Sequence, residues 1–464
     1  MKKLAVITFL TATALLWTAP AAQTAPGDAV RTAEPFTGTV LTDGLDAPWE
    51  MLWGPDGWLW VTERHGKRIT RVHPETGEKK VAATIADVFA GPQHEGILGM
   101  AFGPGMAAKK GQVYAVYTYK NDKGEFERVV RFDYDGDKEI LTNMATVIEG
   151  IPAGDDHQGG RLLFGPEGML YLTKGELGHN QNANYCKPIE AQRLPTEAEV
   201  KDRNYEGYLG KILRMNPDGS IPKDNPKLNG VISHVYTYGH RNPQGLVFVG
   251  NILYSSEQGP SSDDEINSIV SGGNYGWPHV AGFQDDNAYR YANYSAAQNC
   301  KDLKFDANVI PNGVPVQKES DWKTPGNFHP PAKTFYTVPS SYDFTDTRCS
   351  AIPYLCWPTI SPGSIAYYPE DGPIPGWDNS LLVTSLKNGA LYRMPLSRDK
   401  KQIQGYTAVY FHTPNRYRVA RVSPDGKTIF IATDTGGPVM DYTGTPTEKL
   451  ANPGAIIKFE YTGK

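Results

Sequence analysis

Gly54-Pro55-Asp56-Gly57-Trp58-Leu59-Trp60-Val61-Thr62 is the stretch of sequence that decides the fold. The Pro-Asp-Gly portion favours a tight turn, and the apolar residues after it have the composition of a β-strand. A second strand-like segment, residues 68–72, follows within a few positions. A unit of this kind cannot bury both faces of its sheet alone, so it must pack against neighbours.

Looser copies of this unit recur along the chain, each with a turn and two strand-like segments. The further copies begin near Phe102, Gly165, Asn242, Trp377 and Ser423. Six sheets that must stack and close predict an all-β fold, a six-bladed β-propeller of four-stranded antiparallel blades. No linker divides the chain, so we expect one domain over residues 23–464. Long inserts after Gly178 and Gly282 are expected to form loops on one face.

The composition agrees with a fold made of short strands and many turns. The chain has 464 residues, among them 48 glycines, 36 prolines and 26 tyrosines. Glycine and proline favour turns, and tyrosine is enriched in strands. Long helical patterns are nearly absent, and we expect only two brief helices, over residues 196–202 and 264–270.

The first 22 residues have the pattern of a secretory signal peptide. Lys2 and Lys3 precede an apolar run over residues 4–17, and the small residues Ala19-Pro20-Ala21 suit cleavage. The run is short for a membrane span, and no later stretch approaches one. We therefore expect an exported protein, periplasmic or secreted. Removal of the signal moves the formal net charge from −5 to about −7. An acidic surface argues against nucleic acid and anionic membranes as partners.

Four cysteines agree with export but do not make a disulfide scaffold. Cys349 and Cys356 are close enough in sequence to bridge a short loop, which would stiffen the residues between them. Cys186 and Cys300 either pair with each other or stay free, and the sequence does not decide between these states.

Polar loops occur at equivalent points of several repeats, and a propeller gathers such loops at the mouth of its central channel. One carries Asp155-Asp156-His157-Gln158-Gly159-Gly160, in which a glycine-flanked histidine follows a carboxylate. Alone, this motif fits an ordinary surface histidine better than a catalytic one. Its position among the other loops makes His157 a candidate general base, with Asp156 holding its tautomer.

Two further loops indicate an anionic ligand and a metal ion. Arg241 and Asn242 lie in a glycine-flanked loop, and Lys387, Arg416 and Arg418 are expected on the same face. Arginine side chains bind carboxylates bidentately, so this set favours a ligand with several carboxylates. Gly259-Pro260 is followed by the acidic run 263–265, and calcium prefers carbonyl and carboxylate oxygens of these kinds.

These segments resemble the soluble pyrroloquinoline quinone (PQQ)-dependent glucose dehydrogenases of the glucose/sorbosone dehydrogenase family. The resemblance covers nearly the whole mature chain and is densest over residues 156–181, 208–285, 314–322 and 354–434. That family consists of exported six-bladed propellers that bind PQQ and calcium. Several matching segments in the same order are much more specific than any single motif.

The resemblance implies a role for each matching residue. His157 would be the general base and Asp156 its positioning group. The PQQ-binding residues would be Arg241, Asn242, Lys387, Arg416 and Arg418. Calcium at the cofactor would be held by the carbonyls of Gly259 and Pro260. The sugar would contact Gln93, Asp156 and Gln181, with Tyr354 and Trp357 as apolar walls. A second pair of calcium ions, which supports a homodimer in the family, would use Glu265, Tyr275, Ala281, Phe283, Asp285 and Glu319.

Two positions depart from the family pattern. Gln93-His94-Glu95-Gly96 is one residue longer than the family's Gln-Asn-Gly, so either Gln93 or His94 would contact the sugar. Glu176 replaces the aspartate of the family's Gly-Asp-Gln-Gly turn, keeping the charge with a longer reach. Both changes are expected to affect substrate range rather than cofactor binding.

The implied reaction is the oxidation of glucose or a related aldose at C1 to the aldonolactone. Calcium would polarise the quinone carbonyl, and His157 would remove the anomeric hydroxyl proton as hydride leaves for the quinone. Electrons would then pass to an external acceptor, because the sequence holds no Cys-x-x-Cys-His haem motif.

Two rival functions remain open from the sequence. A calcium-dependent propeller lactonase or other hydrolase would place carboxylate ligands in the channel and would not need the cations at Lys387, Arg416 and Arg418. A non-catalytic sugar-binding propeller would share the fold, since fold alone does not prove activity. It would have no need of Asp156 and His157 opposite a metal-binding loop.

Overall fold

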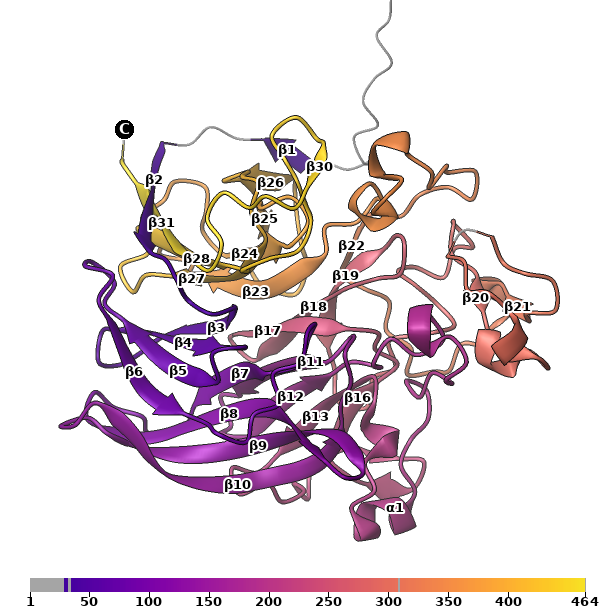
Figure 1. Cartoon of the computed structure of the whole chain (residues 1–464), viewed down its shortest axis with the longest axis horizontal. Coiled ribbons are helices and arrows are strands. Elements are labelled where there is room, and N and C mark those ends of the chain that lie inside the picture. The colour runs from indigo at the N-terminus through magenta and orange to yellow at the C-terminus, as the bar shows by residue number, and fades with distance from the viewer. Residues whose placement is uncertain (1–28, 32–34, 308, 464) are drawn as a thin grey trace, which may run out of the picture.

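The computed structural model describes residues 29–31, 35–307 and 309–463 (Figure 1). The predicted signal peptide, residues 1–22, lies outside the described residues. Six sheets of four antiparallel strands follow one another along the chain. Their innermost strands contact one another in a closed ring, from β3 (Pro48–Trp53) round to β27 (Tyr417–Val422). The fold is the six-bladed β-propeller that the repeats predict.

The blades are described from the innermost strand outward. Blade 1 contains β3, β4 (Leu59–Glu63), β5 (Arg68–Val72) and β6 (Lys79–Thr84). Blade 2 contains β7 (Ile97–Phe102), β8 (Lys110–Asn121), β9 (Gly124–Asp135) and β10 (Ile140–Pro152). Blade 3 contains β11 (Gly159–Phe164), β12 (Leu170–Lys174), β13 (Lys211–Met215) and β16 (Val235–Tyr238).

The remaining blades follow the same scheme. Blade 4 contains β17 (Pro243–Val249), β18 (Ile252–Glu257), β19 (Asp264–Ile269) and β22 (Lys333–Phe335). Blade 5 contains β23 (Pro362–Tyr368), β24 (Ser380–Ser385), β25 (Leu391–Pro395) and β26 (Thr407–Tyr410). The short strand β1 (Ala29–Arg31) adds to its edge, parallel to β26. Blade 6 contains β27, β28 (Thr428–Thr433), β31 (Ile456–Tyr461) and β2 (Phe36–Thr42).

Blade 6 closes the ring because its strands come from both ends of the chain. β2 pairs with β31 in antiparallel register, with Phe36 opposite Tyr461. Figure 1 shows these two strands side by side, although most of the sequence lies between them. Pairing the terminal strands leaves the ring without an open end.

Short helices, 3-10 turns and strands lie in the loops between the long strands. The single α-helix among the described residues, α1 (Glu197–Asp202), begins at a capping box formed by Thr196 and Glu199. It agrees with the helix expected over residues 196–202. The short strands are β14 (Lys227–Leu228), β15 (Val231–Ile232), β20 (Tyr291–Ala292), β21 (Val316–Gln317), β29 (Val439–Met440) and β30 (Pro446–Thr447). The 3-10 turns are η1 (Asn182–Asn184), η2 (Glu206–Tyr208), η3 (Tyr294–Ala296), η4 (Cys300–Asp302), η5 (Glu319–Asp321), η6 (Thr347–Cys349) and η7 (Pro353–Leu355).

The structure corrects two details of the sequence prediction. The helix expected over residues 264–270 is wrong, because this segment forms strand β19. It pairs with β18 on one side and β22 on the other, and these ladders outweigh its weak helical pattern. The fourth repeat also differs, because Asn242-Pro243-Gln244-Gly245 opens an inner strand instead of forming the turn between the first two strands.

A buried arginine ties the inner strands together at the propeller axis. Arg161 on β11 pairs with Glu50 on β3 at 2.5 Å and donates to the carbonyls of Gln244 and Gly363 on β17 and β23. Arg421 on β27 reaches the same Glu50 carboxylate at 2.7 Å. Five of the six inner strands therefore meet through one polar network.

Apolar clusters fill the spaces between neighbouring blades. One cluster packs Trp60 and Ile69 of blade 1 against Tyr117 and Val130 of blade 2. Because each blade is stabilised by such interfaces, the ring is held as one body. Among the described residues, no helix is both long enough and apolar enough to cross a bilayer.

Candidate active site

A cavity of 860 Å³ opens at the mouth of the central channel. Residues from all six blades line it, and the sequence predicts such convergence for loops of several repeats. The sequence-predicted residues on its wall are Gln93, Asp156, His157, Gln181, Arg241, Asn242, Gly259, Pro260, Tyr354, Trp357, Arg416 and Arg418. His94 lines it as well, so the lengthened loop presents both of its candidate side chains to the cavity.

His157 is fixed by a buried carboxylate from the adjoining loop. Its Nδ1 lies 2.5 Å from Oε1 of Glu176, whose side chain is fully buried. The other oxygen of Glu176 accepts the backbone N–H of His179 at 2.8 Å. A carboxylate only accepts hydrogen bonds, so Nδ1 carries the proton. This tautomer leaves the Nε2 lone pair on the cavity side, as a general base requires.

Asp156 lies on the opposite side of the imidazole from Glu176. Its Oδ1 accepts the backbone N–H of His157 at 2.8 Å and is 3.6 Å from Nε2. Burial alone would raise the pKa of Asp156, but the neighbouring His157, His94 and Arg241 lower it to about 2. Asp156 is therefore a carboxylate at neutral pH. It is placed to accept a hydrogen bond from a hydroxyl group near Nε2 of His157.

Gln181 joins the histidine to the cationic side of the cavity. Its Nε2 amide donates to Asp156 Oδ2 at 3.1 Å and is 3.3 Å from His157 Nε2. Its Oε1 accepts from Arg241 Nη2 at 3.0 Å. The side-chain amide thus occupies the place where a hydroxyl donor would contact His157.

Arg241 and Asn242 are anchored by the end of strand β18. The backbone N–H of Arg241 donates to the Glu257 carboxylate, and its Nη1 donates to the Gln258 carbonyl at 3.2 Å. Asn242 Nδ2 donates to the Gln258 side chain at 3.0 Å. Arg241 Nε is buried with no hydrogen-bond partner among the described residues, as is the indole Nε1 of Trp357. In the described part of the chain, both donors lack acceptors beside the cavity, although neither atom is exposed to it.

Arg416 and Arg418 converge on Asp434, which follows strand β28. Arg418 donates to both carboxylate oxygens at 2.9 and 2.8 Å, and Arg416 reaches the same carboxylate at 3.3 Å. Burial would raise the pKa of Asp434, but the two arginines with Arg64 lower it to about 2. Two arginines on one carboxylate leave a net positive charge on this wall.

Arg64 is a further cation on the cavity wall that the sequence analysis missed. Within the described ranges, no hydrogen bond or ion pair joins its guanidinium to another residue. It directly follows β4, the second strand of blade 1. Glu176, Gln258 and Asp434 also come one or two positions after the second strand of their blades. This shared position in the repeat is the signal that would have found Arg64.

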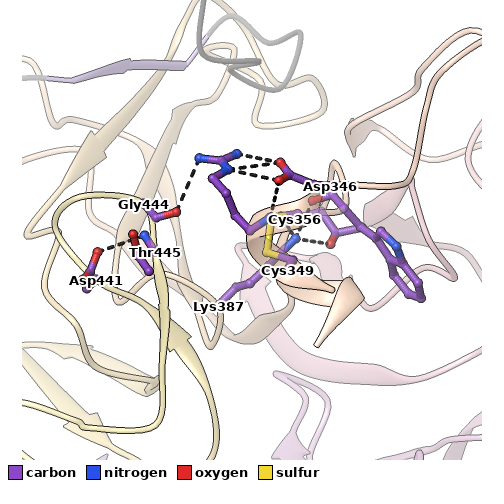
Figure 2. Close-up of a disulfide and its surroundings, with 10 residues drawn as sticks. Asp346, Cys349, Cys356, Lys387, Asp441, Gly444 and Thr445 are labelled. Atoms are coloured by element: carbon purple, nitrogen blue, oxygen red, sulfur yellow. Dashed lines mark hydrogen bonds and ion pairs between the residues drawn. A yellow bond between two sulfur atoms is a disulfide. The ribbon is translucent and has the colours of Figure 1, made fainter. Parts of the chain in front are cut away.

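Lys387 is close to the predicted cofactor residues but does not line the cavity. Its ammonium donates to the Trp357 carbonyl and to Thr359, with Oγ1 at 2.9 Å. Burial lowers its pKa, and the nearby Asp264 carboxylate opposes that shift. Figure 2 shows Lys387 beside the Cys349–Cys356 disulfide, which is present as expected. The disulfide brackets the segment that carries Tyr354, whose hydroxyl accepts from Arg416 at 3.4 Å.

Gly259 and Pro260 also line the cavity. Asp264 holds this turn, because its Oδ1 accepts the N–H of Gly259 at 2.9 Å and its Oδ2 accepts those of Ile360 and Ser361. In the part of the chain that the structure describes, no backbone amide hydrogen-bonds to either carbonyl. Both oxygens are therefore available to a hard cation.

The residues predicted for the second calcium pair surround one loop, residues 281–286. Glu265 accepts the N–H of Gly282 at 2.7 Å, and Glu319 accepts those of Ala281 and Asp286 at 3.0 and 2.9 Å. Burial raises the pKa of Glu319 to about 7, and no basic residue within the described ranges pairs with either glutamate. The Tyr275 hydroxyl donates to the Ser268 carbonyl, Asp285 Oδ1 accepts the backbone N–H of Asn287, and the Phe283 side chain is exposed.

The fold and the cavity together define an enzyme-like propeller, with an oriented histidine, several arginines and available carbonyls at one channel mouth. The chain belongs to the glucose/sorbosone dehydrogenase family, whose family model matches residues 45–310 and 333–441. It is an oxidoreductase of the glucose and aldose sugar dehydrogenase class.

Three relatives illustrate the similarity. Quinoprotein glucose dehydrogenase B of Acinetobacter calcoaceticus is 45% identical over 444 residues, covering 93% of this chain and 92% of the relative. Aldose sugar dehydrogenase YliI of Escherichia coli is 26% identical, covering 86% of this chain and 91% of the relative. The structure of the PQQ-bound aldose sugar dehydrogenase of Streptomyces coelicolor superposes with a TM-score of 0.60 at 28% identity. It covers 92% of this chain and 99% of that chain.

Proposed function

We propose that this protein oxidises glucose or a related aldose at C1 to the aldonolactone, with PQQ and calcium as cofactors. The observation that carries the proposal is the fixed tautomer of His157, whose Nε2 faces a cavity lined by several arginines. Relatives named as a quinoprotein and as a PQQ-bound enzyme support the choice of cofactor.

The donor set of the cavity fits an acidic quinone. PQQ carries three carboxylates and two quinone oxygens, so it needs cations and hydrogen-bond donors. The donors that line the cavity here are Arg241, Asn242, Arg416 and Arg418. Arg241 Nε and Trp357 Nε1 lie beside it, buried and unpartnered among the described residues. Lys387 would join them only if its ammonium turned away from its present carbonyl partners. Gly259 and Pro260 would supply oxygens to the calcium ion.

Bound PQQ with its calcium ion would supply the hydride acceptor. The protein's own part is proton transfer and positioning. His157 Nε2 would accept the proton of the anomeric hydroxyl, and Glu176 would stabilise the imidazolium that forms. Asp156 and Gln181 would hold the sugar hydroxyls beside Nε2, with Gln93 or His94 at the outer side. Tyr354 and Trp357 would form the apolar walls.

A second calcium region is proposed at Glu265, Tyr275, Ala281, Phe283, Asp285 and Glu319. The support is the set of buried carboxylates at the 281–286 loop without a basic partner within the described ranges. Burying carboxylates is costly unless a cation compensates them. By the family resemblance, this region would support a homodimer.

Export to the periplasm or beyond is proposed from the N-terminal sequence, and the two disulfides agree with an oxidising compartment. Electrons would then pass to an acceptor outside the protein. The cationic wall at Arg416 and Arg418 disfavours a hydrolase that needs carboxylate ligands in the channel.

Replacing His157 by glutamine tests the proposal directly. We expect turnover to fall by about 10²-fold or more, because the general base is lost, while PQQ binding is retained. Turnover would be followed with glucose and an artificial dye, and PQQ binding by calorimetry. Near-normal turnover would remove His157 as the base.

A further inference from the structure

Two segments far apart in the sequence meet beside the cavity. The sugar loop, residues 177–187, carries Gln181. The arm, residues 289–307, contains β20, η3 and η4 and stands at the side of the propeller in Figure 1. Cys186 of the sugar loop and Cys300 of the arm form a disulfide across 114 residues. The sequence left this pairing open, and the catalytic proposal above does not use it.

Hydrogen bonds add to this disulfide at both ends of the sugar loop. Asn180 Nδ2 donates to the Ala292 carbonyl at 2.8 Å, and Asn180 Oδ1 accepts the backbone N–H of Ser295 at 3.2 Å. The Tyr185 hydroxyl donates to the Leu303 carbonyl at 2.9 Å. The arm also packs an apolar cluster around Tyr294, which includes Tyr185 and both cysteines.

The sugar loop has an irregular backbone that contacts outside the loop help to hold in place. Leu177, Asn180 and Asn182 all have positive φ angles, at 62°, 62° and 44°. Such conformations cost energy for residues other than glycine and persist only when the surroundings impose them. The loop consists of turns and bends around η1, with three backbone hydrogen bonds of its own, among them Asn180 N–H to the Asn184 carbonyl at 3.1 Å. The arm adds contacts that hold this loop from outside, namely the disulfide and the two hydrogen bonds of the Asn180 side chain.

The arm also forms part of the cavity wall. Tyr289, Tyr291, Phe305 and Asp306 line the same cavity as Gln181. Arg416 and Arg418 belong to blade 6, and among the described residues their side chains hydrogen-bond to Gln244, Tyr354, Leu386, Asp434 and Pro438, all outside the arm. A change in the arm should therefore act on the sugar side of the cavity.

We propose that the arm, locked to the sugar loop by Cys186–Cys300 and by Asn180, positions Gln181 for the aldose. This inference rests on the proposed function for its substrate. The disulfide and Asn180 act through Gln181 and touch neither the reacting atoms nor the cofactor. Loosening the arm raises the KM for the sugar. The affinity for PQQ changes little, because Arg241 keeps its bonds to Glu257 and Gln258 when Gln181 moves.

Two variants test this role from different sides. Cys186→Ser with Cys300→Ser removes the covalent link. Asn180→Gly removes both hydrogen bonds of the side chain, while glycine accepts the positive φ without strain. Asn184→Ala is the matched control, because within the described residues the side-chain amide of Asn184 hydrogen-bonds to the Leu177 carbonyl inside the loop and not to the arm.

We expect the KM for glucose to rise about tenfold in both test variants, because the loss of one positioning contact has an effect of this size. The value of kcat should change less. PQQ affinity, measured by calorimetry on the calcium-loaded protein, should stay within about twofold. The control should keep the wild-type KM. An unchanged KM in both test variants overturns the proposal, as does a parallel loss of PQQ affinity.

Amide hydrogen exchange separates this inference from the proposed function. If the wild-type protein bound no PQQ, the proposed function would fail, yet exchange in residues 177–187 would still report on the arm. Faster exchange there in the Cys186→Ser, Cys300→Ser protein, with unchanged exchange in blade 6, supports the positioning role. Equal exchange in variant and wild type overturns it.

Discussion

Replacing Glu176 by glutamine tests how His157 is kept in the tautomer that a base needs. In the native site, Glu176 accepts from two donors at once, His157 Nδ1–H and the backbone N–H of His179. Glutamine has one accepting oxygen and one donating NH₂ group. Its oxygen can therefore serve only one of these two donors.

The two orientations of the new amide have different consequences. If its oxygen faces His157, its NH₂ group faces the His179 N–H, and two buried donors are left without acceptors. That arrangement costs about 1–3 kcal/mol. If its NH₂ group faces His157, Nδ1 must accept, so the proton moves to Nε2 and the base is lost. The second orientation is therefore favoured, by a factor of about 5–150 at about 1.4 kcal/mol per tenfold.

We expect kcat with glucose to fall by about 10–10²-fold, since only the minor tautomer can act as a base. PQQ affinity should be unchanged, because Glu176 does not line the cavity. Steady-state dye reduction gives kcat, and nitrogen NMR of labelled histidine reports the tautomer. Glu176→Asp is the control, since it keeps an acceptor-only group and should retain more activity. Unchanged kcat in Glu176→Gln, or Nδ1 still protonated, would refute the reasoning.

Three further predictions concern the cationic wall and the axis. Arg418→Ala should weaken PQQ binding by about 10–10²-fold, the value of a charged hydrogen bond, and unchanged reconstitution with PQQ would exclude the assigned role. The pKa of Asp434 is lowered to about 2. The ionised carboxylate therefore stabilises the folded protein above about pH 4, and this contribution is lost as the pH falls towards 2. Urea unfolding of Asp434→Asn should therefore show a deficit of about 2 kcal/mol at pH 6 that shrinks by pH 2.5, and an equal deficit at both would contradict this. Arg161→Met should cost about 3–5 kcal/mol, because Glu50 loses its main partner and two buried carbonyls lose their donor; calorimetry showing an unchanged Tm would refute the axial role.

The sequence predicts the blades well because the repeat is encoded locally. A turn such as residues 54–57 and the strand after it are defined by neighbouring residues, and most copies of this turn join the first two strands of a blade. The prediction fails at residues 264–270, where strand pairing to β18 and β22 decides the structure. Such pairing depends on residues distant in sequence, which a local pattern does not contain.

The cavity wall is predicted from the sequence in part. Convergence of equivalent loops brings most of the candidate residues to one channel mouth. The sequence analysis misses Arg64 because this residue has no motif of its own. It is recognised only by its position after the second strand of a blade. The sequence marks Glu176 only as a difference from the family pattern that affects substrate range. It does not predict the contact with His157 Nδ1, because this contact depends on the fold of the 175–179 turn. The orientation of Lys387 and the Cys186–Cys300 bond also depend on three-dimensional packing.

Reconstitution of metal-free protein tests the central claim most directly. Calcium, PQQ or both would be added, and glucose-dependent reduction of an artificial dye would be followed beside PQQ binding. The account predicts that activity appears only when both are present. Binding of PQQ without glucose activity would redirect the search to other aldoses, whereas no binding of PQQ would contradict the assignment of the cofactor and favour a hydrolytic propeller.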